Sequence, residues 1–148
     1  MGHRVLLATD NSSNAKRAAE YARDLLKGNP KAEVTVLYVE PFYREFHIGR
    51  GIGVEVPIDE EKVTSTARKE ILGKFEGIFT QAGINVKSAV LIGNPAEEIC
   101  TFAAKDKYDL IVMGSRGLNE MKGLFLGSVS HRVLHLAHCP VLIVKPAD

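Results

Sequence analysis

Two short segments near the C-terminus have the residue types of a phosphate-binding loop. GSRG at 114–117 is followed, after nine residues, by GSVS at 127–130. Glycine lets a backbone approach an anion closely, and the N-terminus of a following helix offers unpaired N–H groups with a partial positive charge. Ser128 and Ser130 would add hydroxyl donors there. The same pattern also fits an ordinary strand-to-helix turn with Ser128 as the helix N-cap, and the residues alone leave both interpretations open.

A carboxylate follows the first apolar run of the chain. Residues 5–9 read VLLAT and end at Asp10, as expected for a strand that is buried on both faces. If this strand and the one that ends at Gly114 are neighbours in a parallel sheet, Asp10 and the glycine-rich loop lie at the same edge. Asp10 also fits a helix cap beside Ser12, so its residue type leaves a ligand contact and a structural role open.

Short apolar runs alternate with helical periods along the rest of the chain, which indicates an α/β fold. Strands are predicted at 5–9, 34–39, 86–92, 109–113 and 141–145. Helices are predicted after the N-cap candidates Ser12, Ser13 and Asn14, after Asp59, after Asn94-Pro95, and at about 128–138. Right-handed crossovers then give an open, Rossmann-like, doubly wound sheet of five parallel strands in the order 3-2-1-4-5. We expect one domain, 1–148.

The second helix and the segment before it complete the predicted elements. An apolar stripe of Val63, Ala67, Ile71, Phe75, Ile78 and Ala82 predicts one helix that ends at Gly83. Residues 41–57 show neither a helical nor a strand period and contain three glycines, so they are predicted to form a long loop.

Composition excludes several classes of protein. Nineteen basic and eighteen acidic side chains give a net charge of +1, which provides no general attraction to nucleic acid or to an anionic membrane. No apolar run approaches the roughly 18 residues of a membrane span. Cys100 and Cys139 lack CxxC spacing, so we expect packing residues in a reducing compartment. Residues 1–4 precede a strand and not a signal-peptide segment, which favours a cytoplasmic protein.

Three histidines invite a metal interpretation. His131, His135 and His138 have the spacing i, i+4, i+7, which places them on one face of a helix. Zinc accepts such ligands, but no carboxylate completes an HExxH motif, and the stripe also fits a face in solvent. We predict no metal site. The apolar face opposite should be core: Val129, Val133, Leu136 and Ala137.

The spacing of the three glycines at 114, 117 and 127 resembles the nucleotide-binding signature of the universal stress proteins, in their ATP-binding branch. The resemblance covers nearly the whole chain. It includes TDxS at 9–12, YV at 38–39, GNP at 93–95 and CPVLIV at 139–144. It implies a single universal stress protein domain with the open five-stranded sheet predicted above.

The resemblance also implies an ATP site and a role for each residue in it. Asp10 would hold the ribose hydroxyls, the backbone of Val39 would contact the adenine edge, and Met113 would lie against the base or ribose. The residues expected around the ribose and phosphates are Gly114, Gly117, Gly127, Ser128, Val129 and Ser130. Mg²⁺ or Mn²⁺ would bind through the phosphates.

Other residues of the expected site have less defined roles. Ala8 and Thr9 are also expected at the site. Ala8 stands where the family often has proline or another residue, and only its backbone should line the site. Arg116 fits either a phosphate contact or a solvated side chain. Three further side chains of the 41–57 segment either close over a nucleotide or lie in solvent: Arg44, His47 and Arg50.

The resulting function prediction is an ATP-binding universal stress protein that acts as a nucleotide-dependent regulator in the stress response. Val141–Val144 is apolar and ends the sheet, so we expect a homodimer through this edge. One alternative is a slow ATPase or phosphoryl-transfer enzyme, but the sequence contains no Walker lysine and no arranged nucleophile. Another is an interaction module that binds AMP, a cyclic nucleotide or no nucleotide. We expect no nucleic acid or membrane partner, and the sequence assigns no protein partner.

Overall fold

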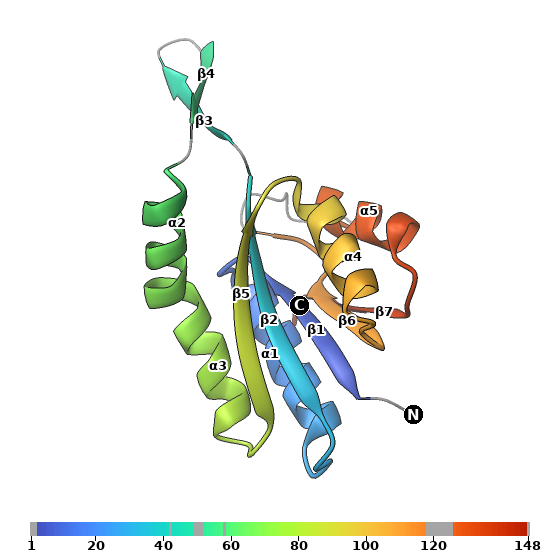
Figure 1. Cartoon of the computed structure of the whole chain (residues 1–148). Coiled ribbons are helices and arrows are strands. Elements are labelled where there is room, and N and C mark those ends of the chain that lie inside the picture. Colours follow the sequence, from blue (N-terminus) through green and yellow to red (C-terminus); the bar gives the residue numbers. More distant parts are fainter. Residues whose placement is uncertain (1–2, 42, 49–51, 58, 118–125, 148) are drawn as a thin grey trace.

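A parallel sheet of five strands forms the centre of the molecule (Figure 1). The computed structural model describes residues 3–41, 43–48, 52–57, 59–117 and 126–147, with 43–48 and 52–57 as backbone. The strands are β1 (Arg4–Thr9), β2 (Glu33–Glu40), β5 (Asn85–Ile92), β6 (Leu110–Gly114) and β7 (Val141–Val144), in the order β5-β2-β1-β6-β7. This confirms the predicted Rossmann-like fold and strand order, and each strand end lies within one residue of its predicted position.

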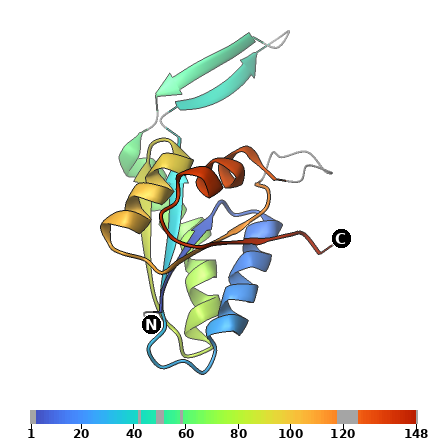
Figure 2. The same ribbon diagram turned by 90° about the vertical axis from the view of Figure 1, so that its right-hand side faces the viewer.

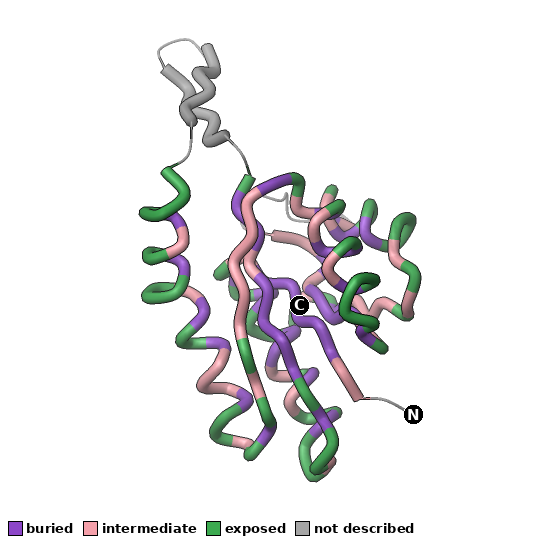
Figure 3. The backbone as a smooth tube through the Cα atoms, in the orientation of Figure 1, coloured by how far each residue is buried: buried purple, intermediate pink, exposed green. Residues whose placement is uncertain are grey.

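Helices cover both faces of this sheet (Figure 2). One face packs against α1 (Ser13–Leu26) and α3 (Gly73–Thr80), and the other against α4 (Pro95–Lys105) and α5 (Ser128–Leu136). Successive residues of β1 face opposite layers, so Leu7 belongs to the first core and Leu6 to the second. Figure 3 shows the central strands as the most buried part of the backbone. Within the described residues, no helix has the length and apolarity to cross a membrane.

Side-chain caps start three of the helices at the predicted positions. Ser12, Asp59 and Asn94 each accept a hydrogen bond from a backbone N–H three residues later, at 3.0, 3.2 and 3.2 Å. Asp59 starts α2 (Glu60–Ala67), and Asn94 is followed by proline at the first position of α4. These caps fix where each helix leaves the end of a strand.

The prediction of a long loop over 41–57 is wrong. β3 (Tyr43–Ile48) and β4 (Ile52–Pro57) pair antiparallel as a hairpin that extends beyond the main sheet (Figure 1). β-branched residues recur with period two at 52, 54 and 56, a strand signal that the glycines of this segment obscure. The side chains of Arg44 and His47, and all of Arg50, lie outside the described part of the molecule.

The predicted second helix contains a π-helical turn at Arg68–Leu72, between α2 and α3. This turn adds a residue to the helical repeat, so the buried face steps five positions from Ala67 to Leu72. The predicted member at this point, Ile71, is only half-buried. The single 3.6-residue period assumed from the sequence therefore places this part of the stripe one residue too early.

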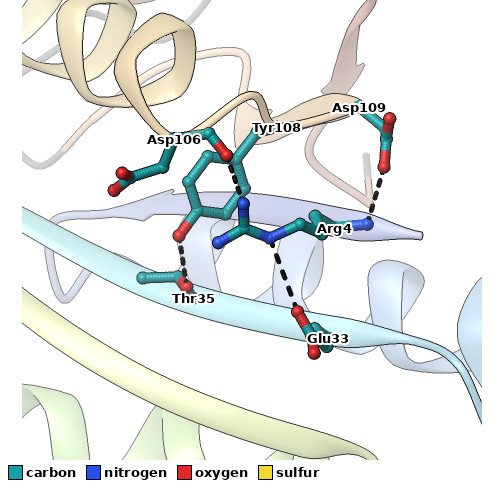
Figure 4. Close-up of polar contacts among 6 residues, drawn as sticks. All are labelled: Arg4, Glu33, Thr35, Asp106, Tyr108 and Asp109. Carbon is teal, nitrogen blue, oxygen red and sulfur yellow. Dashed lines mark hydrogen bonds and ion pairs between the residues drawn. The ribbon is translucent and has the colours of Figure 1, made fainter. Parts of the chain in front are cut away.

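A polar cluster ties the strands together at their amino ends (Figure 4). The guanidinium carbon of Arg4 lies 4.8 Å from the centre of the Tyr108 ring, and its Nε lies 3.4 Å from Glu33 Oε2. The hydroxyl oxygens of Tyr108 and Thr35 are buried and 2.6 Å apart. The cluster joins β1 and β2 to the turn before β6, at the end of the sheet opposite the strand termini that carry Asp10 and Gly114.

We expect Tyr108→Phe to lower the free energy of unfolding by about 1–3 kcal/mol, because it leaves the buried Thr35 hydroxyl without its partner. Urea denaturation followed by circular dichroism measures the loss. Tyr21→Phe is the matched control, since Tyr21 is 52% exposed. Equal stability of the two variants would contradict a stabilising role for the Tyr108–Thr35 hydrogen bond.

Candidate functional site

A cleft of about 530 Å³ opens at the carboxyl ends of β1, β2 and β6. The order of the sheet reverses between β1 and β6, and in open α/β sheets this is the point where ligands bind. Every residue of the predicted site except Ser128 lines the cleft. The structure therefore places these predicted residues at one edge of the sheet.

Several lining residues were missed by the sequence analysis. They come from the end of β2 and from the first turns of α1 and α4: Ala15, Leu37, Tyr38, Glu40, Pro41, Pro95 and Ile99. Leu37, Val39, Ile99 and Met113 are buried members of one apolar core, and they give the cleft an apolar wall. The predicted cap at Asn94 could have indicated that the start of α4 reaches this edge.

Asp10 combines the two roles that the sequence left open. Its Oδ1 accepts a hydrogen bond from the Ser12 N–H at 3.0 Å, which holds the turn into α1. Asn11 within this turn has a φ of +69°. A Cβ added at Gly117 would contact Asp10 Oδ2, so the carboxylate also lies against the glycine-rich loop. The two features that suggested chemistry are therefore adjacent in space.

Asn14 is buried, and it is not the N-cap of α1. Its Oδ1 accepts a hydrogen bond from the Arg116 N–H at 3.0 Å and lies 3.4 Å from Ser115 Oγ. Its Nδ2 donates to the Val144 carbonyl at 3.1 Å. One side chain thus joins α1, the loop after β6 and the end of β7, a role that local sequence patterns do not reveal.

Gly114 is required by packing against α1. A Cβ at Gly114 would lie 2.8 Å from Asn14 Cγ and Oδ1, and 3.2 Å from the Asn14 backbone carbonyl carbon. These distances are too short for a side chain of any size unless the Asn14 side chain or the start of α1 moves. The glycine therefore lets α1 approach the loop, apart from any contact with a ligand.

The start of α5 differs from the interpretation that made Ser128 its N-cap. Gly127 is the N-cap, with φ −72° and ψ 168°, so this glycine needs no positive φ. Gly127 has no side chain that could accept a hydrogen bond from the first amides of the helix, and Ser128 is exposed. Ser130 Oγ lies 2.8 Å from the Ser115 carbonyl oxygen and 3.1 Å from that of Gly127. Its hydroxyl therefore donates a hydrogen bond to the backbone of the loop. The N-terminus of α5 faces the cleft with its partial positive charge.

The histidines do not converge with other ligating groups. The rings of His131 and His135 are 5.0 Å apart between their centroids and exposed, and His138 follows the end of α5. In the described parts of the chain, no three histidine, cysteine, aspartate or glutamate side chains are placed to hold a metal ion. Val133 is buried as predicted, but Leu136 is 37% exposed, so its assignment to the core is wrong.

Both cysteines are free thiols on the α4–α5 side of the sheet. Burial raises the pKa of the Cys100 thiol, and burial likewise raises the pKa of Cys139. A raised thiol pKa leaves less thiolate at neutral pH, which fits packing residues.

Comparison with known proteins assigns the family. The model of the universal stress protein family matches residues 1–145. The chain belongs to the universal stress protein family. A universal stress protein of Methanocaldococcus jannaschii is 34% identical over 148 residues, which cover 96% of this chain and 81% of that relative.

Solved structures share the fold over their whole length. A second universal stress protein of M. jannaschii has a structure with 27% identity and a TM-score of 0.76, covering 100% of this chain and 99% of the other. A family member from Arabidopsis thaliana, solved with AMP bound, has 21% identity and a TM-score of 0.68, covering 99% of this chain and 97% of the other.

Substitution at Gly114 tests the close approach of α1. Gly114→Ala should lower the free energy of unfolding by about 1–3 kcal/mol, because the new methyl group overpacks against Asn14. Gly77→Ala in α3 is the control, since a Cβ there meets nothing within 4 Å and should stabilise the helix by about 0.5–1 kcal/mol. Chemical denaturation compares the two, and a neutral Gly114→Ala would contradict the contact.

Proposed function

We propose that this universal stress protein binds ATP in the cleft at the β1–β6 edge and acts as a nucleotide-dependent regulator in the stress response. The observation that carries the proposal is the contact between Asp10 and Gly117. It brings a carboxylate suited to ribose hydroxyls next to a loop suited to phosphates. The volume of about 530 Å³ falls within the range of small-ligand sites.

Each part of the nucleotide has a matching part of the cleft. The base fits the apolar wall, to which Val39 and Met113 both belong. The ribose hydroxyls donate to Asp10, and the phosphates lie between segments 114–117 and 127–130 at the N-terminus of α5. Mg²⁺ or Mn²⁺ would bind through the phosphates and neutralise part of their charge.

Thr9 also lines the cleft at the end of β1 and is 8% exposed. AMP in the Arabidopsis family member supports an adenine nucleotide in this fold.

Two substitutions separate the ribose from the phosphates. Asp10→Ala should weaken ATP and adenosine alike, by about 1.5–3 kcal/mol, because both ligands carry the ribose hydroxyls. Gly127→Val should weaken ATP by on the order of 2 kcal/mol, and adenosine far less, because its side chain stands between the α5 amides and the phosphates. Its effect cannot come from φ, which is −72°.

Calorimetric titration of folded variants with ATP, AMP and adenosine, with Mg²⁺ present, measures these differences. Unchanged ATP binding by Gly127→Val would show that the phosphates do not lie at this loop. Absence of binding of any adenine nucleotide to the parent protein would contradict the proposed function itself.

We also propose that the protein forms a homodimer through β7, the edge strand next to β6. Ile111 N–H donates to the Pro140 carbonyl and Ser115 N–H to the Val144 carbonyl, so the even-numbered residues of β7 bond to β6. The N–H groups of Val141 and Ile143 then point to the open edge. A two-fold axis would pair this edge with its own copy.

Ile143→Pro should shift the protein from dimer to monomer, because it removes an outward N–H and leaves the bonds to β6 in place. Ile143→Ala keeps the N–H and is the matched control for loss of the side chain. Sedimentation velocity at tens of micromolar distinguishes the species. A monomeric parent, or a folded Ile143→Pro variant that stays dimeric, would count against this interface.

A further inference from the structure

We propose that Asn14 is a positioning residue for phosphate binding: it clamps the first turn of the glycine-rich loop to the end of β7 and so fixes Gly117 beside Asp10. This inference rests on the proposed nucleotide site and adds a residue that touches none of the expected ligand groups. Its side chain acts on the loop through the Arg116 backbone N–H and the Ser115 hydroxyl.

The hydrogen bonds of the Asn14 amide define both the clamp and its orientation. Oδ1 accepts from the Arg116 N–H at 3.0 Å, and Nδ2 donates to the Val144 carbonyl at 3.1 Å. An N–H partner and a carbonyl partner leave only one orientation of the amide. The residue is 6% exposed, so water does not compete effectively for either bond.

The requirements of α1 alone do not explain an asparagine here. Ser12 caps the helix, and Asn14 occupies a position inside its first turn, where asparagine is a poorer helix former than alanine. The neighbouring helix residue that packs into the core is Ala15. A buried amide at position 14 is accounted for by the groups it joins outside the helix.

The clamp determines where the loop goes next. The Ser115 N–H donates to the Val144 carbonyl at 3.0 Å, and the Arg116 N–H is used by Asn14. With these two amides fixed, the next residue, Gly117, lies against the Asp10 carboxylate. The carboxylate is held separately, by the Ser12 N–H. Loss of the clamp should therefore loosen the phosphate side of the site and spare the ribose side.

This separation gives the role a signature that a loss of stability would not produce. Asn14→Ala removes both bonds of the amide, whereas Asn14→Asp keeps an acceptor for the Arg116 N–H and loses the donor to Val144. Tyr108→Phe is the control, because it also removes a buried hydrogen bond, at the opposite end of the same sheet.

The experiment measures the ratio of ATP affinity to adenosine affinity by calorimetry, in the full chain with Mg²⁺, at a temperature where all variants are folded. Asn14→Ala should lower the ratio about tenfold, because only part of the stabilisation lost with the two bonds of the amide acts on the phosphates. Asn14→Asp should give an intermediate ratio, and Tyr108→Phe should keep that of the parent. If Asn14→Ala does not fold, Asn14→Asp decides the question: its ratio of ATP affinity to adenosine affinity should be lower than that of the parent.

The outcomes separate this inference from the function on which it rests. The positioning role would be overturned if both Asn14 variants kept the parent's ratio of ATP affinity to adenosine affinity, which includes an equal loss of both affinities. Such a result would leave the proposed nucleotide site unaffected. A parent that binds adenosine as tightly as ATP would instead overturn the assignment of the phosphates to this loop, and the positioning role with it.

Discussion

The close approach of α1 to the loop after β6 is the constraint on which the cleft depends. Gly114 has no Cβ, so the side chain of Asn14 can lie against its backbone. That contact places the amide within hydrogen-bond distance of Arg116 and of Val144 at the end of β7. The same approach brings Asp10, at the entry to α1, against Gly117. Two segments about a hundred residues apart in the chain thereby become one surface.

The electrostatics of this surface are local. The chain as a whole carries a net charge of +1, which has little effect on a charged ligand at a distance. At the cleft, the N-terminus of α5 begins at a glycine, so no side chain from the N-cap neutralises its first amides. Arg116 lines the same cleft and adds a positive charge. The side of the cleft at Arg116 and the α5 N-terminus therefore favours an anion, whereas the carboxylates of Asp10 and Glu40 line the same cleft and oppose it.

Much of this arrangement could be predicted from the sequence, because its determinants are local. Ser12, Asp59 and Asn94 mark helix starts through their own side chains, and the apolar runs mark strands that can be ordered by the rules of right-handed crossover. The family resemblance then assigned ligand roles to residues that, apart from Ser128, line one cleft in the structure. Those roles stay predictions until a ligand is measured.

The features that were missed depend on partners distant in sequence or on a change of period. Asn14 looks like one of three possible caps until its partners at 116 and 144 are known. The π-helical turn after Ala67 shifts the buried face in a way that a constant period cannot represent. The strand at 52–57 alternates as strands do, but the three glycines within 41–57 suggested a loop. Gly127 has an extended conformation, so a side chain at this position is not opposed by a positive φ.

The most direct test of the nucleotide site is a comparison of backbone amide shifts by NMR, with ATP and with adenosine added separately to the labelled protein. The account predicts that both ligands shift the amides of Asp10 and Val39. Only ATP should produce large shifts at Gly117, Ser128 and Val129, where the phosphates would lie. Shifts at those three amides that are the same for both ligands, or an ATP-specific change elsewhere in the molecule, would contradict the placement of the phosphates at the N-terminus of α5.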